Sequence, residues 1–271
     1  MRKSVVCIVL VSSCLLCNTN FAQSISVGAK GGISIPNLTA GGSANPLSRG
    51  YQSSLGANAA LYGEYSFSNL FSVELSAEYS AQGGKKHGKQ ALPVTAAIAA
   101  LFPPNQAPPY LWTNFNADAK LDYLLVPLLA KVGFDIGNHS AWRVYASAGP
   151  FAGFLLRATT ITSGSDNVYA DEAETQPLLT GPVSFDSIAN VKDQLKNFNW
   201  GIEANIGLAY HFQQHSIFIE GGGNYGFIPI QKLKEDGQNH TGAASVRIGY
   251  AFTFGSVNHA RRSVKSPKVF N

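Results

Sequence analysis

The sequence predicts an all-β fold: an eight-stranded antiparallel transmembrane β-barrel. Two observations lead to this prediction. Apolar and polar residues alternate with a period of two along eight long segments, which is the pattern of strands with one apolar and one polar face. The connections between the segments are alternately short and long, as in outer-membrane barrels, which have tight periplasmic turns and extended extracellular loops. A barrel of ten strands, with an extra hairpin in the second or third long connection, is the structural alternative.

The composition agrees with such a barrel. Of the 271 residues, 45% are hydrophobic and only 13% are charged, and Gly (27), Phe (16) and Tyr (11) are frequent. Soluble domains carry about 25% charged residues, so this chain has little charge for a broad basic face that binds nucleic acid. The formal net charge of +4 comes from basic residues at the two ends of the chain, and the body between them is slightly acidic.

Residues 1–22 have the three parts of a secretory signal peptide. Arg2 and Lys3 are followed by an apolar run and then by a polar stretch that ends at Ala22. The apolar run is shorter than the roughly 20 residues of a spanning helix, so we expect cleavage after Ala22. The alternative is a lipoprotein signal, in which the run VSSC leaves a lipidated Cys14 at the mature N-terminus. In both cases the chain leaves the cytoplasm.

The barrel domain is predicted over residues 23–255. In its clearest strand, 245–254, Val, Ile, Tyr and two Phe alternate with small or polar residues. Most segments have ten residues or more, and a tilted strand needs about 9–11 to cross a bilayer. The eight predicted strands are about 25–35, 54–67, 70–82, 118–136, 142–158, 197–212, 216–229 and 243–255.

Four long connections are predicted to lie outside the cell: loop 1 (36–53), loop 2 (83–117), loop 3 (159–196) and loop 4 (230–242). Loop 2 begins with basic residues and continues with an apolar stretch, of which 91–101 is expected to form either a short helix at the membrane surface or a cover over the barrel mouth. Loop 3 is acidic. Loops on a rigid scaffold commonly form binding surfaces, so we expect a binding role here.

Aromatic residues gather beside the three short connections, 68–69, 137–140 and 213–215, and predict a girdle at the membrane interface. The residues concerned are Phe67, Phe71, Phe134, Trp142, Tyr210 and Phe212.

Ten charged residues are predicted to face the lumen. The interior of an eight-stranded barrel is just wide enough to be filled by side chains, and an unpaired buried charge is costly. We therefore predict that opposite charges pair into a plug that stabilises the barrel; a path for ions or solutes is the functional alternative. The residues are Lys30, Glu64, Glu74, Glu78, Lys131, Asp135, Arg143, Glu203, Glu220 and Arg247.

Two segments carry a family resemblance. LDYLLVPLLAK (121–131) and RVYASAGPFAGFLL (143–156) resemble the PorT-like outer-membrane β-barrel proteins of Bacteroidetes, and VGAKGGI (27–33) and NWGIEANIGL (199–208) are similar to that family too. The resemblance covers nearly all of 23–255. It implies an outer-membrane barrel; a few members act in protein secretion, and most have no assigned activity. The long loops 2 and 3 and the basic tail depart from the smallest members.

The last predicted strand resembles the signal that is read by the barrel-insertion machinery. The pattern is polar-x-Gly-x-x-aromatic-x-aromatic, and Arg247, Gly249, Phe252 and Phe254 match it. An exposed strand edge can be captured as an added strand. The basic tail, 256–271, follows this strand and is expected to emerge in the periplasm, either as a disordered end or as a contact for an acidic partner.

The sequence offers little for catalysis. It has no phosphate-binding loop and no His-Glu-x-x-His zinc helix, and His211 and His215 are interpreted as part of a solvated turn. Glu235, Asp236 and His240 are a crude match to a lipid hydrolase, interpreted as a polar loop tip. We predict a non-enzymatic structural or interaction protein of the cell envelope without a cofactor. Its expected partners are outer-membrane lipid, the insertion machinery, and envelope or secretion proteins, and not nucleic acid. A small channel is the first alternative and a lipid hydrolase the second.

Overall fold

The computed structural model describes residues 24–39, 45–137 and 140–254. The predicted signal peptide (1–22), the alternative lipidation site at Cys14 and the basic tail (256–271) lie outside these residues. In the described part of the chain, no helix is long and apolar enough to cross a membrane.

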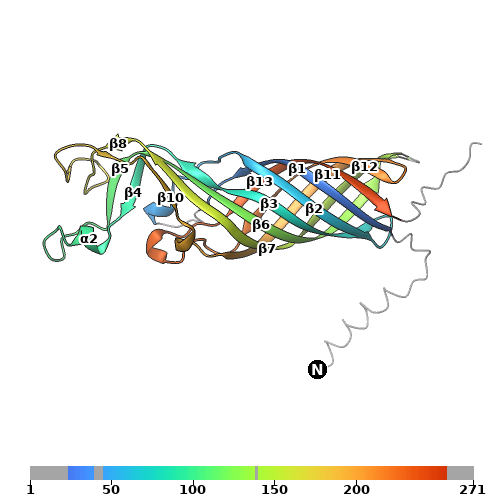
Figure 1. The fold of residues 1–271 in the computed structure, drawn as a ribbon, viewed down its shortest axis with the longest axis horizontal. Coiled ribbons are helices and arrows are strands. Elements are labelled where there is room, and N and C mark those ends of the chain that lie inside the picture. Colours follow the sequence, from blue (N-terminus) through green and yellow to red (C-terminus); the bar gives the residue numbers. More distant parts are fainter. Residues whose placement is uncertain (1–23, 40–44, 138–139, 255–271) are drawn as a thin grey trace, which may run out of the picture.

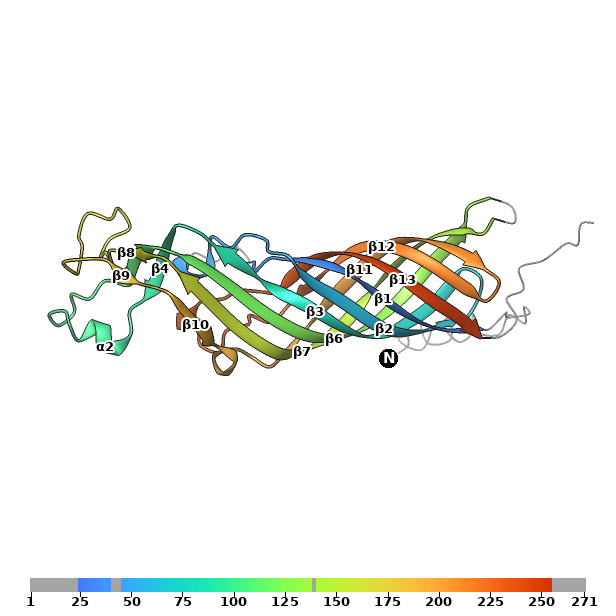
Figure 2. The same cartoon turned by 45° about the horizontal axis from the view of Figure 1, so that its top comes forward.

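Eight strands form a closed antiparallel barrel (Figures 1 and 2). Around the wall the order is β7-β11-β12-β13-β1-β2-β3-β6, and β6 pairs with β7 to close the ring. The strands are β1 (Ser24–Pro36), β2 (Gly56–Ser66), β3 (Phe71–Lys86), β6 (Asn116–Asp135), β7 (Trp142–Ser163), β11 (Phe198–Phe212), β12 (His215–Gly226) and β13 (Gly242–Phe254). The predicted fold class is therefore confirmed.

The ten-stranded alternative is wrong. An extra hairpin does form in loop 2, between β4 (Lys89–Pro93) and β5 (Tyr110–Asn114), but it makes a separate two-stranded sheet outside the barrel wall. In loop 3 the short strand β10 (Ser187–Asn190) pairs only with the outer end of β7. The strands β3 and β7 run four to five residues beyond their predicted ends, at 82 and 158, so the wall is taller on this side than the sequence predicts.

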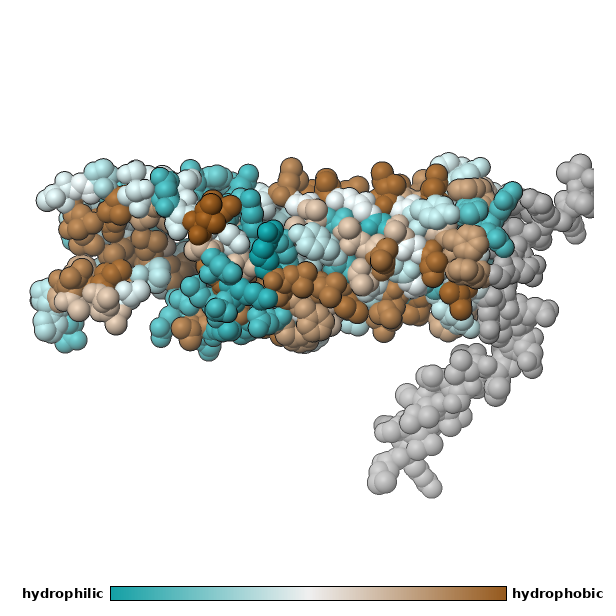
Figure 3. All heavy atoms as spheres, in the orientation of Figure 1, coloured by the Kyte–Doolittle hydropathy of each residue, from teal (hydrophilic) through white to brown (hydrophobic). Residues whose placement is uncertain are grey.

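The alternation of the sequence becomes an outer apolar face and an inner polar one. On β13, outward Val246, Ile248 and Tyr250 are 45%, 68% and 45% exposed, whereas the intervening residues are buried. Figure 3 shows hydrophobic side chains along the barrel half of the molecule and a hydrophilic region where the barrel meets the loops. The aromatic residues predicted for the girdle are exposed at the short-turn end, where Trp142 packs edge-on against Tyr210 at 5.0 Å.

Two apolar clusters occupy the inside of the barrel. The one nearer the short turns is built from Tyr62, Tyr145 and Phe218 with two alanines. It fits because glycines face the large rings: a Cβ on Gly207 would lie 2.3 Å from the Tyr145 ring. The other cluster lies toward the loops and comprises Leu38, Leu121, Tyr123, Leu125, Phe151, Leu155, Ala158, Leu195 and Ile230. The charged residues of the lumen lie on the same strands, and Glu64, Lys131, Asp135 and Arg143 line the short-turn mouth together with the first cluster.

Loops 2 and 3 join into one extension at the long-loop end of the barrel (Figures 1 and 2). Trp112 of β5 exchanges backbone hydrogen bonds with Tyr169, at 2.9 and 2.8 Å, and a two-residue ladder, β8 (Ser165–Asp166) with β9 (Val183–Ser184), lies beside it. Of the two alternatives for 91–101, a helix is formed over only part of the segment. The helix α2 covers Ala96–Ala99, β4 occupies 89–93, and α2 lies at the far tip of the extension.

Candidate functional site

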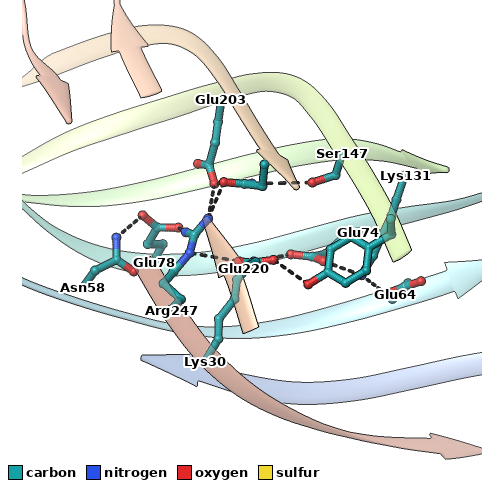
Figure 4. Close-up of polar contacts among 12 residues, drawn as sticks. Lys30, Asn58, Glu64, Glu74, Glu78, Lys131, Ser147, Glu203, Glu220 and Arg247 are labelled. Carbon is teal, nitrogen blue, oxygen red and sulfur yellow. Dashed lines mark hydrogen bonds and ion pairs between the residues drawn. The ribbon is translucent and has the colours of Figure 1, made fainter. Parts of the chain in front are cut away.

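The lumen holds one buried ion-pair network whose centre is Arg247 on β13. The Arg247 side chain is 1% exposed and contacts three carboxylates: Glu78 at 2.6 Å, Glu203 at 3.0 Å and Glu220 at 2.9 Å (Figure 4). It also donates to Asn205 Oδ1 at 2.6 Å. These partners come from β3, β11 and β12, so the guanidinium ties three strands to β13.

The network continues through two lysines toward the short-turn end. Lys30 Nζ lies 2.7 Å from Glu74 Oε1 and 3.0 Å from Glu220 Oε1. Lys131 Nζ lies 3.5 Å from Glu74 Oε2 and 2.8 Å from Glu64 Oε2. Positive and negative groups therefore alternate from Glu64 to Arg247 along the lumen.

Neutral donors complete the network, because its five carboxylates outnumber its three cations. Asn58 Nδ2 donates to Glu78 at 2.7 Å, Ser72 Oγ to Glu64 at 2.6 Å and the Tyr145 hydroxyl to Glu220 at 2.9 Å. With Tyr145 from β7, every strand of the barrel contributes a side chain. A buried charge is tolerated only when it is paired and hydrogen-bonded, and this arrangement meets that condition.

The structure places the other two predicted lumen residues, Asp135 and Arg143, at the short-turn mouth. They form their own ion pair at 3.0 Å with 46% and 23% of the side chains exposed, and Arg143 also donates to the backbone of Gly133 and Asn69. A cavity of about 130 Å³ opens beside them. Glu64 and Lys131 line it, but none of the Arg247 contacts does, so the cavity stops at the network.

The residues of the predicted insertion pattern lie on both faces of β13. Arg247 points into the lumen, and Gly249 faces the Phe218 ring, which a Cβ would meet at 2.1 Å. Phe252 and Phe254 pack edge-on at 4.8 Å at the short-turn end, with Phe254 53% exposed. Reading of this pattern by the insertion machinery stays a prediction.

The residues considered for catalysis are not assembled into a site. His240 Nδ1 lies 3.0 Å from the Gly226 carbonyl oxygen and its ring stacks on Tyr225; in the described part of the chain no hydrogen bond or ion pair joins it to Glu235 or Asp236. His215 Nδ1 lies 2.5 Å from the Tyr250 hydroxyl. Among the described residues, no three His, Cys, Asp or Glu side chains are grouped so as to hold a metal ion.

A family comparison decides what this barrel is. The family model described as outer membrane protein beta-barrel domain matches residues 21–232. The chain belongs to this family. It is therefore located in the outer membrane. In outer-membrane barrels the short turns face the periplasm and the long loops face the cell exterior.

Solved structures of similar barrels are known from other organisms. OprG from Pseudomonas aeruginosa is 13% identical over 87% of this chain and 97% of its own, with a TM-score of 0.38. Neisserial surface protein A is 13% identical over 84% and 96%, with a TM-score of 0.35. The attachment invasion locus protein Ail of Yersinia pestis is 14% identical over 86% and 100%, with a TM-score of 0.34. No curated protein matches the sequence.

On the extracellular side of the outer-membrane barrel, the basic loop 2 and the acidic loop 3 contact each other. Lys89 Nζ donates to the Glu172 carbonyl oxygen at 2.7 Å and lies 3.6 Å from the Glu174 carboxylate. Asn114 Nδ2 donates to Asp166 at 2.7 Å and to Glu174 at 3.1 Å. We call this unit, residues 87–115 with 164–190, the extracellular cap. Sequence reasoning assigned the two loops opposite charge but did not pair them.

Proposed function

We propose that this protein is a closed, non-enzymatic outer-membrane barrel that anchors the extracellular cap and presents it to partners of the cell envelope. The observation that carries the proposal is the ion-pair network around Arg247. It fills the lumen with buried side chains from all eight strands, next to two apolar clusters. A wall held in this way is a rigid support, and rigid supports commonly carry binding loops.

The family resemblance indicates which kind of partner protein to expect. The segments 121–131 and 143–156 resemble PorT-like proteins of Bacteroidetes, a few of which act in protein secretion. We therefore propose an envelope assembly, with protein secretion as its first candidate role. The order of the cap supports this role, since its two loops are fixed to each other by Lys89, Asn114 and the Trp112–Tyr169 backbone pair.

A conductance measurement separates this proposal from the channel alternative. The full chain is inserted into planar bilayers and compared with the variants Glu74→Gln, inside the network, and Arg143→Gln, at the periplasmic mouth. We expect the wild-type protein to show no steady channels. Steady wild-type channels that either variant abolishes would refute the closed barrel.

A crosslinking experiment tests the role of the cap. Residues 90–113 are replaced by a short Gly-Ser linker, and crosslinked partners are captured from membranes with the wild-type chain and with this variant. Heat-modifiable gel mobility, which reports a folded barrel, serves as the control for both. We expect the variant to keep the mobility shift and to lose the partners. Identical capture by both chains would contradict a role of the cap.

A further inference from the structure

A second cavity lies on the extracellular side, where loop 1 meets the base of the cap. Its volume is about 240 Å³. The side chains that matter for its chemistry come from four separate parts of the chain: Arg49 from loop 1, Lys86, His87 and Lys89 from the end of β3 and the start of β4, Trp112 from β5 and Glu172 from loop 3. None of these residues belongs to the lumen network.

The cavity carries an excess of positive charge. Three basic residues, Arg49, Lys86 and Lys89, line it together with one acidic residue, Glu172. Of these three basic residues, only Lys89 has a described carboxylate oxygen within 4 Å of its charged group, that of Glu174 at 3.6 Å. Arg49 is exposed and Lys86 is buried, and both lack an ionic partner in this part of the chain.

Lys86 is the residue whose surroundings most favour a bound anion. It is 8% exposed. Its ammonium donates to the Leu47 carbonyl oxygen at 2.7 Å and lies 4.3 Å from the centre of the Tyr51 ring. Both contacts are with neutral groups, and a buried cation without a counter-charge is costly. Burial lowers the pKa of Lys86 to about 8, so a bound anion would stabilise its charged form.

Trp112 gives the same cavity an aromatic wall. Its backbone is held on both sides, by Ala91 of β4 and by Tyr169 of loop 3, so the indole has a fixed support. Small-ligand sites combine an apolar or aromatic wall with a few placed polar groups. A cavity of this size, lined by cations and by a flat ring, suits one sugar ring that bears one charged group.

We propose that this pocket binds an anionic sugar, a single ring that carries a sulfate, phosphate or carboxylate group. Lys86 and Arg49 contact the anion, and the face of Trp112 packs against the ring. The inference rests on the proposed function in one respect, that the cap faces the cell exterior. Two sources supply this chemistry there: the phosphorylated sugars of the lipopolysaccharide around the barrel, and soluble acidic polysaccharides.

The test is binding of glucose 6-sulfate to the full chain in detergent, measured by calorimetry, with glucose as the neutral control. We expect glucose 6-sulfate to bind and glucose not to bind. The variant Lys86→Met should weaken binding by about tenfold or more, and Arg49→Gln, which removes an exposed side chain without disturbing packing, should weaken it too. Lys120→Met is the matched control, because Lys120 is exposed and lies 3.8 Å from Asp118 outside the pocket. This variant should bind glucose 6-sulfate with the affinity of the wild type.

The pH dependence gives a readout that packing alone would not produce. A sulfate ester stays charged throughout, so affinity should fall as the pH rises through about 8, where Lys86 loses its proton. The other titratable or charged groups near Lys86 are Tyr51, Arg49, Lys89, His87 and Glu172. Lys86→Met should abolish the fall above pH 8.

A competition experiment identifies which of the two sources supplies the ligand. Lipopolysaccharide and a soluble sulfated polysaccharide are each added against glucose 6-sulfate; displacement by either one supports the pocket and identifies the source. Absence of binding at 10 mM (about the weakest affinity of use to a cell surface), or equal weakening by Lys86→Met and Lys120→Met, would overturn the proposal. If glucose 6-sulfate does not bind and the wild-type protein shows no channels, only the proposed sugar site is refuted. If the wild-type protein forms channels and still binds the sugar, only the proposed function is refuted.

Discussion

Replacing Arg247 by Met should destabilise the barrel more than any other single change of charge in the lumen. Arg247 is the largest fully buried side chain, and its removal leaves Glu78 and Glu203 without a cation. Glu220 keeps Lys30 at 3.0 Å. Removal of one partner from a buried ion pair costs about 3–5 kcal/mol, and we expect a loss of that size in the free energy of unfolding.

The matched control is Arg143→Met at the periplasmic mouth. Its partner Asp135 is 46% exposed, and exposed ion pairs contribute about 0–1 kcal/mol. Both variants are unfolded by urea in lipid vesicles, with tryptophan fluorescence as the signal. Adding Glu78→Gln and Glu203→Gln to Arg247→Met should recover part of the loss, since neutral amides leave no unpaired charge. The reasoning fails if Arg247→Met and Arg143→Met lower the free energy of unfolding equally.

Three further predictions concern packing, pH and the tail. Gly207→Ala places a methyl group against the Tyr145 ring and should lower the free energy of unfolding by about 1–3 kcal/mol in the same urea assay. Gly63 has open space around it, so Gly63→Ala should lower it much less. Equal losses would contradict the packing argument. Because burial lowers the folded-state pKa of Lys86 to about 8, below that of the unfolded chain, the unfolded state binds more protons between about pH 8 and 10.5. Stability where loop 1 packs on the end of β3 should therefore rise over that range and stay flat below it, as followed by hydrogen exchange of the Gln52–Lys85 backbone pair, and Lys86→Met should remove the rise. Deletion of 258–271 should leave membrane insertion and heat-modifiable mobility intact; loss of assembly would instead place part of the insertion signal in the tail.

The barrel wall was predictable because lipid imposes a rule on every residue of it. Side chains that face hydrocarbon must be apolar, and successive side chains of a strand point to opposite faces, so each strand is visible in a local window. The ends were less predictable. The strand β7 continues through Arg157, Thr159 and Thr160, where the alternation of apolar and polar residues stops.

The candidate sites were predictable as sets of residues but not as contacts. Parity along the strands selects the lumen residues, yet the pairing of Arg247 with Glu78, 169 positions away, depends on how the strands are staggered around the closed wall. The cap shows the same limit. Lys89 of loop 2 donates to the backbone of Glu172, 83 positions away, and the opposite charge of loops 2 and 3 does not predict this contact. The extracellular pocket combines Arg49, Lys86 and Trp112 from separate segments, and no local sequence pattern predicts it.

The seam between β1 and β13 has a consequence for how the barrel assembles. This seam joins the first strand to the last, with Gly32 opposite Arg247 and Gly31 opposite Ile248. A slip of one residue in the pairing of β13 would exchange its two faces and turn Arg247 toward lipid. An arginine at the bilayer midplane costs about 2–4 kcal/mol, and the carboxylates left behind would add to this. The charge on the last strand therefore favours the correct alignment at closure over a shifted one, because only the correct alignment places the central cation among its carboxylates.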